Sequence, residues 1–147
     1  MAKLPNKWPD KEKELLVAAL AAVMADIATT KIALASGKSE ETNPLLGKQP
    51  SGATLDMAGG LSALGGMGLA SMMPDRWRAP MLGGWAGLEA GLAMQNMMPG
   101  RRTFEESLMF PMALGGISAL LSAAGGDTSN LRINLGKSPS ITYTKKF

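Results

Sequence analysis

Residues 83–91 read Gly-Gly-Trp-Ala-Gly-Leu-Glu-Ala-Gly, and this stretch decides the expected fold class. Glycine recurs at Gly83, Gly87 and Gly91, and a spacing of four places these residues on one face of an α-helix. Glycine in an exposed helix costs about 1 kcal/mol relative to alanine. Close approach of a second helix backbone would compensate for that cost, so we expect a tightly packed helix here.

The same spacing of small residues recurs in each of the other predicted helices. The sets are Ala18 and Ala22; Ala58, Ser62, Gly66 and Ala70; and Gly115, Ala119 and Ala123. Smooth faces of this kind hold helices together in lipid, where hydrophobicity contributes little to association. A chain rich in alanine and glycine also produces such spacings by chance. Four sets in four segments favour tight packing, within the chain, between copies, or both.

Composition narrows the fold and the chemistry. Valine occurs twice and isoleucine five times, which is poor in strand formers, whereas alanine, leucine and methionine favour helices. The absence of cysteine and histidine excludes disulfides, Cys/His zinc sites, thiolate nucleophiles and histidine-based triads. A net charge of +3 is too weak and scattered to indicate nucleic-acid sequence recognition. We predict an all-α protein that is not an enzyme, with no cofactor, metal, catalytic residue or small-molecule substrate.

Capping and proline signals divide the chain into four helices and a tail. We expect helices over about residues 10–36, 54–73, 75–98 and 103–124, within a helical membrane domain of residues 1–126. Asp10 and Asp75 are the expected caps of the first and third helices. Ser51 or Thr54 is expected to cap the second. A Thr-x-x-Glu capping box at residues 103–106 opens the fourth, in which Pro111 predicts a kink.

Three of the segments contain charge-poor stretches of 18, 21 and 19 residues. Each stretch is long enough to cross a hydrocarbon core about 30 Å thick. A soluble bundle with buried hairpins is the alternative, and a mean hydropathy of +0.05 keeps it open. Soluble helices should present polar outward faces, so we predict a four-helix, Gly/Ala-rich membrane bundle. Ten Lys and Arg residues on the side of the termini, against four on the other, predict cytoplasmic termini, with Trp8 and Trp77 as interfacial anchors.

Charged residues within apolar segments form the next group of candidates. Asp26, Lys31 and Glu89 lie in such segments and should face inward, because an unpaired charge in a bilayer is costly. We expect Asp26 or Glu89 to pair with Lys31 or Arg78. A structural ion pair that fixes helix register is favoured over a proton or ion pathway.

The polar loop between the first two helices carries a recognisable pattern. It reads Glu41-Thr-Asn43-Pro44-Leu-Leu-Gly47-x-x-Pro50-Ser51, which is the chemistry of a defined turn. A structural loop is the default interpretation. The sharper alternative is that Glu41 and Asn43 fold over the end of the bundle to meet Arg78 or Asn96.

Together with an Asp-x-x-Thr-Thr stretch starting at Asp26 and the Glu-Ala-Gly at residues 89–91, this loop resembles a set of small helical membrane proteins of proteobacteria and their phages. The resemblance covers roughly residues 22–96. It implies a small helical membrane fold and nothing catalytic. The fourth segment and the tail lie outside the match, which suggests a specialised, phage-type version.

The last residues, 127–147, change character. Leu131, Ile133 and Leu135 alternate with polar residues, and Ile141 and Tyr143 do the same. We expect a C-terminal docking tail that adds strands to a partner or to neighbouring copies. A disordered basic tail is the alternative.

The functional hypothesis follows from these features. We expect a non-enzymatic, membrane-embedded assembly protein that self-associates through small-residue helix faces into a ring, pore or scaffold. A phage ejection or holin-like protein in a bacterial membrane or virion is its concrete form. The expected partners are the lipid bilayer and further copies or a larger protein assembly. An accessory subunit of an inner-membrane complex is the alternative, and a small transporter is a weaker one.

Overall fold

The computed structural model describes residues 8–37, 40–41, 45–98, 104–123, 131–134 and 140–143 of the 147. The four predicted helices are present in this part of the chain, followed by two short strands. The elements are α1 (Asp10–Ala35), α2 (Gly52–Met72), α3 (Asp75–Asn96), α4 (Phe104–Ala123), β1 (Leu131–Asn134) and β2 (Ser140–Tyr143). The helices are therefore 20 to 26 residues long, which corresponds to about 30 to 39 Å.

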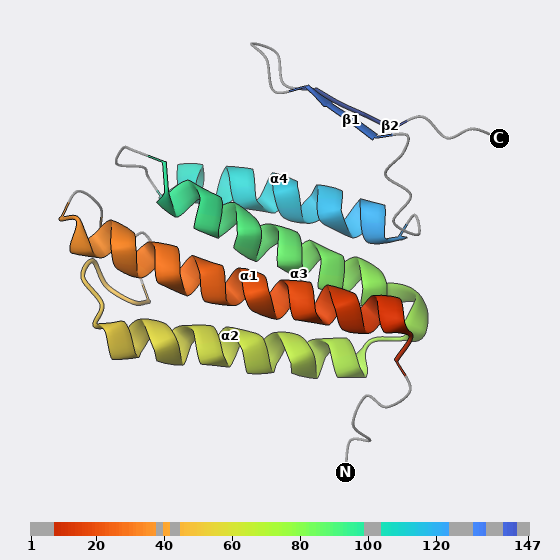
Figure 1. Ribbon diagram of the computed structural model, residues 1–147, viewed down its shortest axis with the longest axis horizontal. Coiled ribbons are helices and arrows are strands. Elements are labelled where there is room, and N and C mark those ends of the chain that lie inside the picture. The colour runs from red at the N-terminus through yellow and green to blue at the C-terminus, as the bar shows by residue number, and fades with distance from the viewer. Residues whose placement is uncertain are drawn as a thin grey trace.

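The four helices lie side by side in an order that differs from their order in the sequence (Figure 1). The most extensive contact joins α3 to α4, and the next joins α1 to α3. The second helix packs on α1 and touches α3 only slightly. Helices α1 and α3 are therefore central, whereas α2 and α4 form the two edges of the bundle.

Two of the expected helix caps are wrong. Pro9 and Pro74, not Asp10 and Asp75, occupy the positions before α1 and α3. Proline suits this place because its fixed φ fits the chain entering a helix. The two aspartates lie in the first turn instead, where a carboxylate is stabilised by the helix dipole.

The second helix begins as one of the two alternatives predicted. The Ser51 hydroxyl accepts a hydrogen bond from the Thr54 backbone N–H at 3.1 Å, so α2 starts at Gly52. At the end of α1, Gly37 has φ +67°, and in the following loop Gly47 has φ +74°. Left-handed backbone of this kind favours glycine. The proposed capping box begins at Thr103, and the loop motif includes Asn43 and Pro44; these three residues lie outside the described part of the chain.

The two strands form an antiparallel hairpin. The register pairs Leu131 with Tyr143 and Ile133 with Ile141, so the apolar positions of the sequence alternation are partners across the ladder. Docking of this tail onto a partner stays a prediction.

The outer surface of the bundle is apolar over much of its length. Large exposed side chains include Val17, Met24 and Ile32 on α1, Met57, Leu61, Leu64, Leu69 and Met72 on α2, and Met109, Met112 and Leu120 on α4. By length and hydropathy, α1 alone among the described helices could span a membrane, and most of its apolar window is not buried inside the bundle. A shorter apolar helical stretch covers Leu108–Ala123 of α4.

Candidate functional site

The glycine face of α3 lies against the backbone of α4. A Cβ atom added at Gly87 would stand 2.8 Å from the Leu114 carbonyl oxygen, and one at Gly91 would stand 2.6 Å from the Pro111 Cα. At Gly83 it would meet the Ser118 carbonyl oxygen at 2.8 Å. Because these obstacles are backbone atoms, no side-chain rotation can relieve them. The three glycines therefore allow a helix–helix approach that alanine would prevent.

The fourth helix meets this face with small residues of its own. A Cβ at Gly115 would lie 3.0 Å from the Gly84 carbonyl oxygen, and Ala119 packs beside Gly84. Pro111 is fully buried in the same contact, where its ring lies against Gly91. Pro111 thus occupies the space on α3 that Gly91, which has no side chain, leaves open.

Two glycines of α2 receive side chains from the central helices. Gly66 lies under the Trp85 ring, and Gly59 lies against the Ile27 side chain. Within the four-residue set on α2, Gly66 and Ala70 are buried, whereas Ala58 and Ser62 are half-buried. The α1 set is displaced by one position: Ala18 is exposed, and the fully buried alanine is Ala19.

Other glycines on the bundle edges have no neighbour among the described residues. A Cβ added at Gly60, Gly65 or Gly68 of α2, or at Gly116 of α4, would meet nothing within 4 Å in that part of the chain. These residues expose bare helix backbone beside large apolar side chains such as Leu64. In the described part of the chain, α2 is thus the helix with the most unfilled glycines.

A buried arginine joins three helices at one end of the bundle. The Arg78 guanidinium donates to the Glu12 carboxylate of α1 at 2.9 Å and to Asp75 at 2.8 Å. It also donates to carbonyl oxygens at the end of α2, those of Ala70 at 3.2 Å and Met73 at 3.1 Å. The Trp8 ring lies 4.9 Å from the guanidinium carbon, in cation–π contact. Glu12 and Arg78 are both buried, so this is a desolvated ion pair with its hydrogen bonds made.

A second polar group lies in the middle of the bundle. Glu89 of α3 is only 8% exposed, and its Oε1 accepts hydrogen bonds from the Ser62 hydroxyl at 2.9 Å and from the Trp85 indole at 3.1 Å. Because Ser62 belongs to α2, Glu89 connects the edge helix to the centre. Each donor is neutral.

Asp26 of α1 forms the third polar group, nearer the loop end. Its carboxylate accepts a hydrogen bond at 2.8 Å from the Asn96 amide of α3, and the same amide donates to the buried Thr30 hydroxyl at 2.8 Å. Asp26, Glu89, Ser62, Thr30 and Asn96 make up what we call the polar seam.

The ion pairs expected from the sequence are not the ones that form. Lys31 pairs with Asp56 of α2 at 2.6 Å, and Arg78 pairs with Glu12 and Asp75. Neither Asp26 nor Glu89 forms an ion pair in the described part of the chain. The two bases lie near helix ends, where closer carboxylates were available. No sequence signal distinguishes Glu12 from its exposed neighbours in the first turn of α1.

The loop between α1 and α2 has Arg78 and Asn96 as its two predicted contacts. The contact of Glu41 with Asn96 stays a prediction, and Asn43 lies outside the described part of the chain. A meeting with Arg78 is excluded, because Arg78 lies at the opposite end of α1 beside Glu12. The Glu41 backbone N–H donates to the Lys48 carbonyl at 3.0 Å, which closes the loop.

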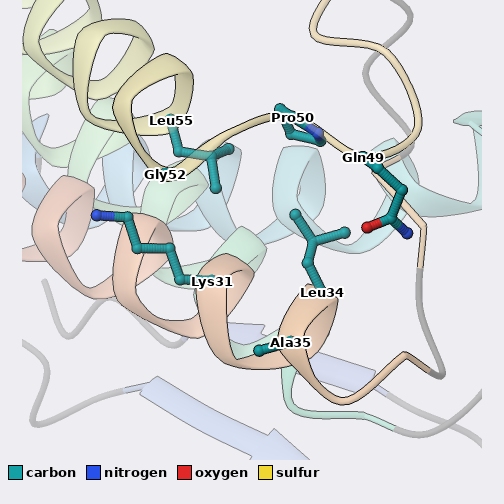
Figure 2. Close-up of a pocket in the computed structure, with 7 residues that line it drawn as sticks. All are labelled: Lys31, Leu34, Ala35, Gln49, Pro50, Gly52 and Leu55. Atoms are coloured by element: carbon teal, nitrogen blue, oxygen red, sulfur yellow. The ribbon is translucent and has the colours of Figure 1, made fainter.

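An open pocket of about 320 Å³ lies where this loop joins α2. Leu34, Pro50 and Leu55 line it, with Gln49 on one side and Lys31 on the other (Figure 2). The Lys31 ammonium points away from Gln49 and pairs with Asp56. Among the residues that the structure describes, no group of three His, Cys, Asp or Glu side chains is placed to hold a metal ion.

No protein-family model, curated protein or solved structure matches this chain. The resemblance drawn from the loop pattern therefore stays a prediction. Geometry alone identifies the candidate functional features: the glycine-packed helices, the unfilled α2 edge and the polar seam.

Proposed function

We propose that this chain is a non-enzymatic, membrane-embedded assembly protein. The observation that carries the proposal is the distribution of charge along the helices. Outside the first and last five residues of each helix, the described helices carry only two charged residues, Asp26 and Glu89. Both belong to the polar seam, where Glu89 is buried and Asp26 is half-buried. The surface between the ends is formed by apolar side chains and bare glycine. A surface of this kind suits lipid or a neighbouring helix better than water.

The helix contacts support the same environment. In lipid, close backbone approach and a few interhelical hydrogen bonds hold helices together. The α3–α4 contact depends on backbone approach at three glycines, and the polar seam supplies the hydrogen bonds between α1, α2 and α3. Exposed Trp77 and the Trp8–Arg78 pair lie at one end, as interfacial anchors do.

Membrane insertion can be tested with cysteine labelling, because the chain contains no cysteine. Ser36 and Ser71 are exposed and lie at opposite ends of the bundle. With both termini cytoplasmic, Ser36→Cys should react with a membrane-impermeant maleimide in intact cells. Ser71→Cys should react only after lysis. Release of the protein into the supernatant on carbonate extraction would contradict insertion, and equal labelling of both variants would contradict the topology.

The proposed assembly contact is the edge of α2. Gly60, Gly65 and Gly68 remain unfilled by the described residues, whereas Gly59 and Gly66 receive a side chain from within the chain. A second copy would fill the open ones. Contact by this edge alone gives a symmetric dimer, while contact between the α2 edge and the α4 edge of the next copy gives a ring or an open chain.

Two matched variants test this contact. Gly68→Leu and Gly116→Leu each add a side chain where nothing lies within 4 Å, so both should fold. Gly68→Leu should reduce the cross-linked oligomer to monomer. If Gly116→Leu does the same, the assembly is head-to-tail; if it does not, the dimer is symmetric. An unchanged oligomer ladder with Gly68→Leu would remove α2 from the proposal.

The finer forms of this function rest on the sequence alone. A phage ejection or holin-like protein is the form suggested by the fourth segment and the tail, which lie outside the loop resemblance. An accessory subunit of an inner-membrane complex would instead co-purify with host membrane proteins in amounts equal to its own. Purification from detergent-solubilised membranes, with and without residues 127–147, distinguishes self-assembly from that alternative.

A further inference from the structure

The β1–β2 hairpin packs on none of the described helices. In that part of the chain the two strands contact each other, and all the remaining contacts between elements join helices to helices (Figure 1). A two-stranded hairpin on its own is only marginally stable in water. Burial of an apolar face against a surface outside the bundle would therefore stabilise it.

The register sorts the hairpin into two faces. Residues paired directly across an antiparallel ladder share a face, and successive residues of a strand alternate between the faces. One face holds the four apolar residues of the strands: Leu131, Ile133, Ile141 and Tyr143. The other face holds the four polar residues: Arg132, Asn134, Ser140 and Thr142. The hairpin is thus an amphipathic ribbon with one apolar face.

The charge of the tail identifies the kind of surface that can cover this face. The side chains of residues 128–147 include no acid and four bases: Arg132, Lys137, Lys145 and Lys146. Two such tails would repel each other, and like charges oppose pairing between strands of two copies. A surface that is negatively charged and also takes up apolar groups suits both properties. The headgroup layer of a membrane with anionic lipids is such a surface.

The hairpin is tethered to the end of the bundle that carries Trp77. Ser122, near the end of α4, lies against Gly83, near the start of α3. Exposed Trp77 lies in the first turn of α3. Residues 124–130 connect α4 to β1, and a connection of that length spans at most about 30 Å. With cytoplasmic termini, this end meets the cytoplasmic leaflet, whose anionic lipids attract basic segments.

The backbone of the hairpin limits how deeply it can enter a membrane. In a two-stranded sheet each strand pairs along one edge only, so its other edge presents unpaired N–H and C=O groups. Such groups are costly in hydrocarbon, whereas water in the headgroup layer can satisfy them. The hairpin therefore suits the headgroup layer, with one face toward the acyl chains and the other toward water.

We propose that the β1–β2 hairpin lies flat in the headgroup layer of an anionic membrane, with its apolar face toward the lipid and Arg132 on the opposite face. The apolar residues anchor the hairpin, and the bases select anionic lipid. The inference rests on the proposed function, because it takes the bundle to be inserted in the same membrane. It gives the C-terminal tail a lipid partner, and strand addition to a second copy becomes an outcome that the test separates.

The test places an environment-sensitive fluorophore on each face of the hairpin in the full chain. The chain contains no cysteine, so Ile141→Cys directs an NBD label to the apolar face and Thr142→Cys directs it to the polar face. Both chains are reconstituted into vesicles of phosphatidylcholine, with or without an equal amount of phosphatidylglycerol. In the anionic vesicles the label at position 141 should shift to the blue and be quenched by doxyl-labelled lipid. The label at position 142 should stay in water.

Charge variants in the Ile141→Cys chain measure the contribution of the bases. Omitting phosphatidylglycerol should lower the ratio of inserted to withdrawn hairpin by more than about tenfold. Arg132→Gln should lower this ratio in the anionic vesicles by about threefold to fivefold. The matched control is Lys48→Gln, which removes an exposed base of the loop at the opposite end of the bundle and should leave the ratio unchanged. If a label on β2 disrupts the hairpin, Ile133→Cys and Asn134→Cys repeat the measurement on β1.

The outcomes separate this inference from the proposed function. A label at position 141 that stays in water in anionic vesicles, on a chain that resists carbonate extraction, would overturn the hairpin inference alone. A chain that carbonate strips from the vesicles would overturn both. A blue shift that needs no phosphatidylglycerol, escapes lipid quenching and grows with the ratio of protein to lipid would assign the hairpin to a second copy instead.

Discussion

The two edges of the bundle are attached to its centre in different ways. Helix α4 is attached by shape, because glycines on α3 allow backbone to meet backbone along three successive turns. Helix α2 is attached at a few points: the Lys31–Asp56 pair, the Ser62–Glu89 bond, the arginine at its end, and two glycines that receive side chains. The same residue type, glycine, therefore closes one interface and leaves the other edge open.

The largest effect should come from filling the closed interface. Gly87→Leu places a bulky side chain against the Leu114 carbonyl, which cannot move without displacing α4. We expect a loss of more than about 4 kcal/mol in the free energy of unfolding, measured by denaturant titration in micelles. Leu88→Ala, at the neighbouring half-buried position, should cost about 1 to 2 kcal/mol. Equal losses for the two variants would contradict backbone contact as the basis of this edge.

The next effect should come from the arginine that fastens the end of α2. Arg78→Met leaves the buried Glu12 carboxylate without its partner, and we expect a cost of about 3 kcal/mol. Arg78→Lys should recover little, because an ammonium cannot reproduce the guanidinium's contacts with two carboxylates and two carbonyls. The double variant Glu12→Leu/Arg78→Met should regain stability over the single variant. If the two changes are simply additive, the pair does not couple α1 to α3.

A smaller effect is expected at the loop end of the polar seam. Asn96→Leu removes the amide that donates to both Asp26 and Thr30. Loss of this donor should cost about 1 to 2 kcal/mol, because a half-buried carboxylate loses its hydrogen bond. The exposed Met94, changed to alanine, serves as the control in the same turn of α3. A loss no greater than that of the control would show that the amide is replaceable by water.

The smallest effect should come from the exposed tie between α1 and α2. Lys31→Met breaks the pair with Asp56, but their side chains are 39% and 61% exposed. Such pairs contribute less than about 1 kcal/mol and are screened by salt. The difference between Lys31→Met and wild type should therefore shrink as ionic strength rises. A large difference that salt does not change would mean that the pocket beside Lys31, rather than the ion pair, holds this end of α2.

The extent of the helices is predictable because capping and helix-ending residues act within a few residues of the helix ends. Ser51 and Gly37 mark a beginning and an end with chemistry that acts over a few residues. Pro9 and Pro74, rather than the expected aspartates, precede α1 and α3. This difference moves each cap by one residue and hardly changes the extent of the helix.

The partners of the polar residues could not be predicted from the same signals. Glu12 and Arg78 are 66 residues apart, and Asp26 and Asn96 are 70 apart. Their contacts depend on which helices become neighbours. Because all four helices share the same four-residue spacing of small residues, that spacing does not predict which helices pack together. For the same reason the spacing predicts packing for Ala18, which is exposed, and gives no signal for the position of α2 at the edge of the bundle.

The arginine contact also has a consequence in time. A ribosome adds about 5 to 20 residues per second, so the 66 residues between Glu12 and Arg78 take about 3 to 13 s to synthesise. During that interval α1 has been synthesised with a carboxylate whose partner does not yet exist. The Glu12 carboxylate therefore lacks its partner until the α2–α3 turn and Arg78 have been synthesised. Only then can this end of the bundle pack. Slowing translation just before residue 78 should prolong the period in which the nascent chain is open to proteolysis or to capture by an insertion factor.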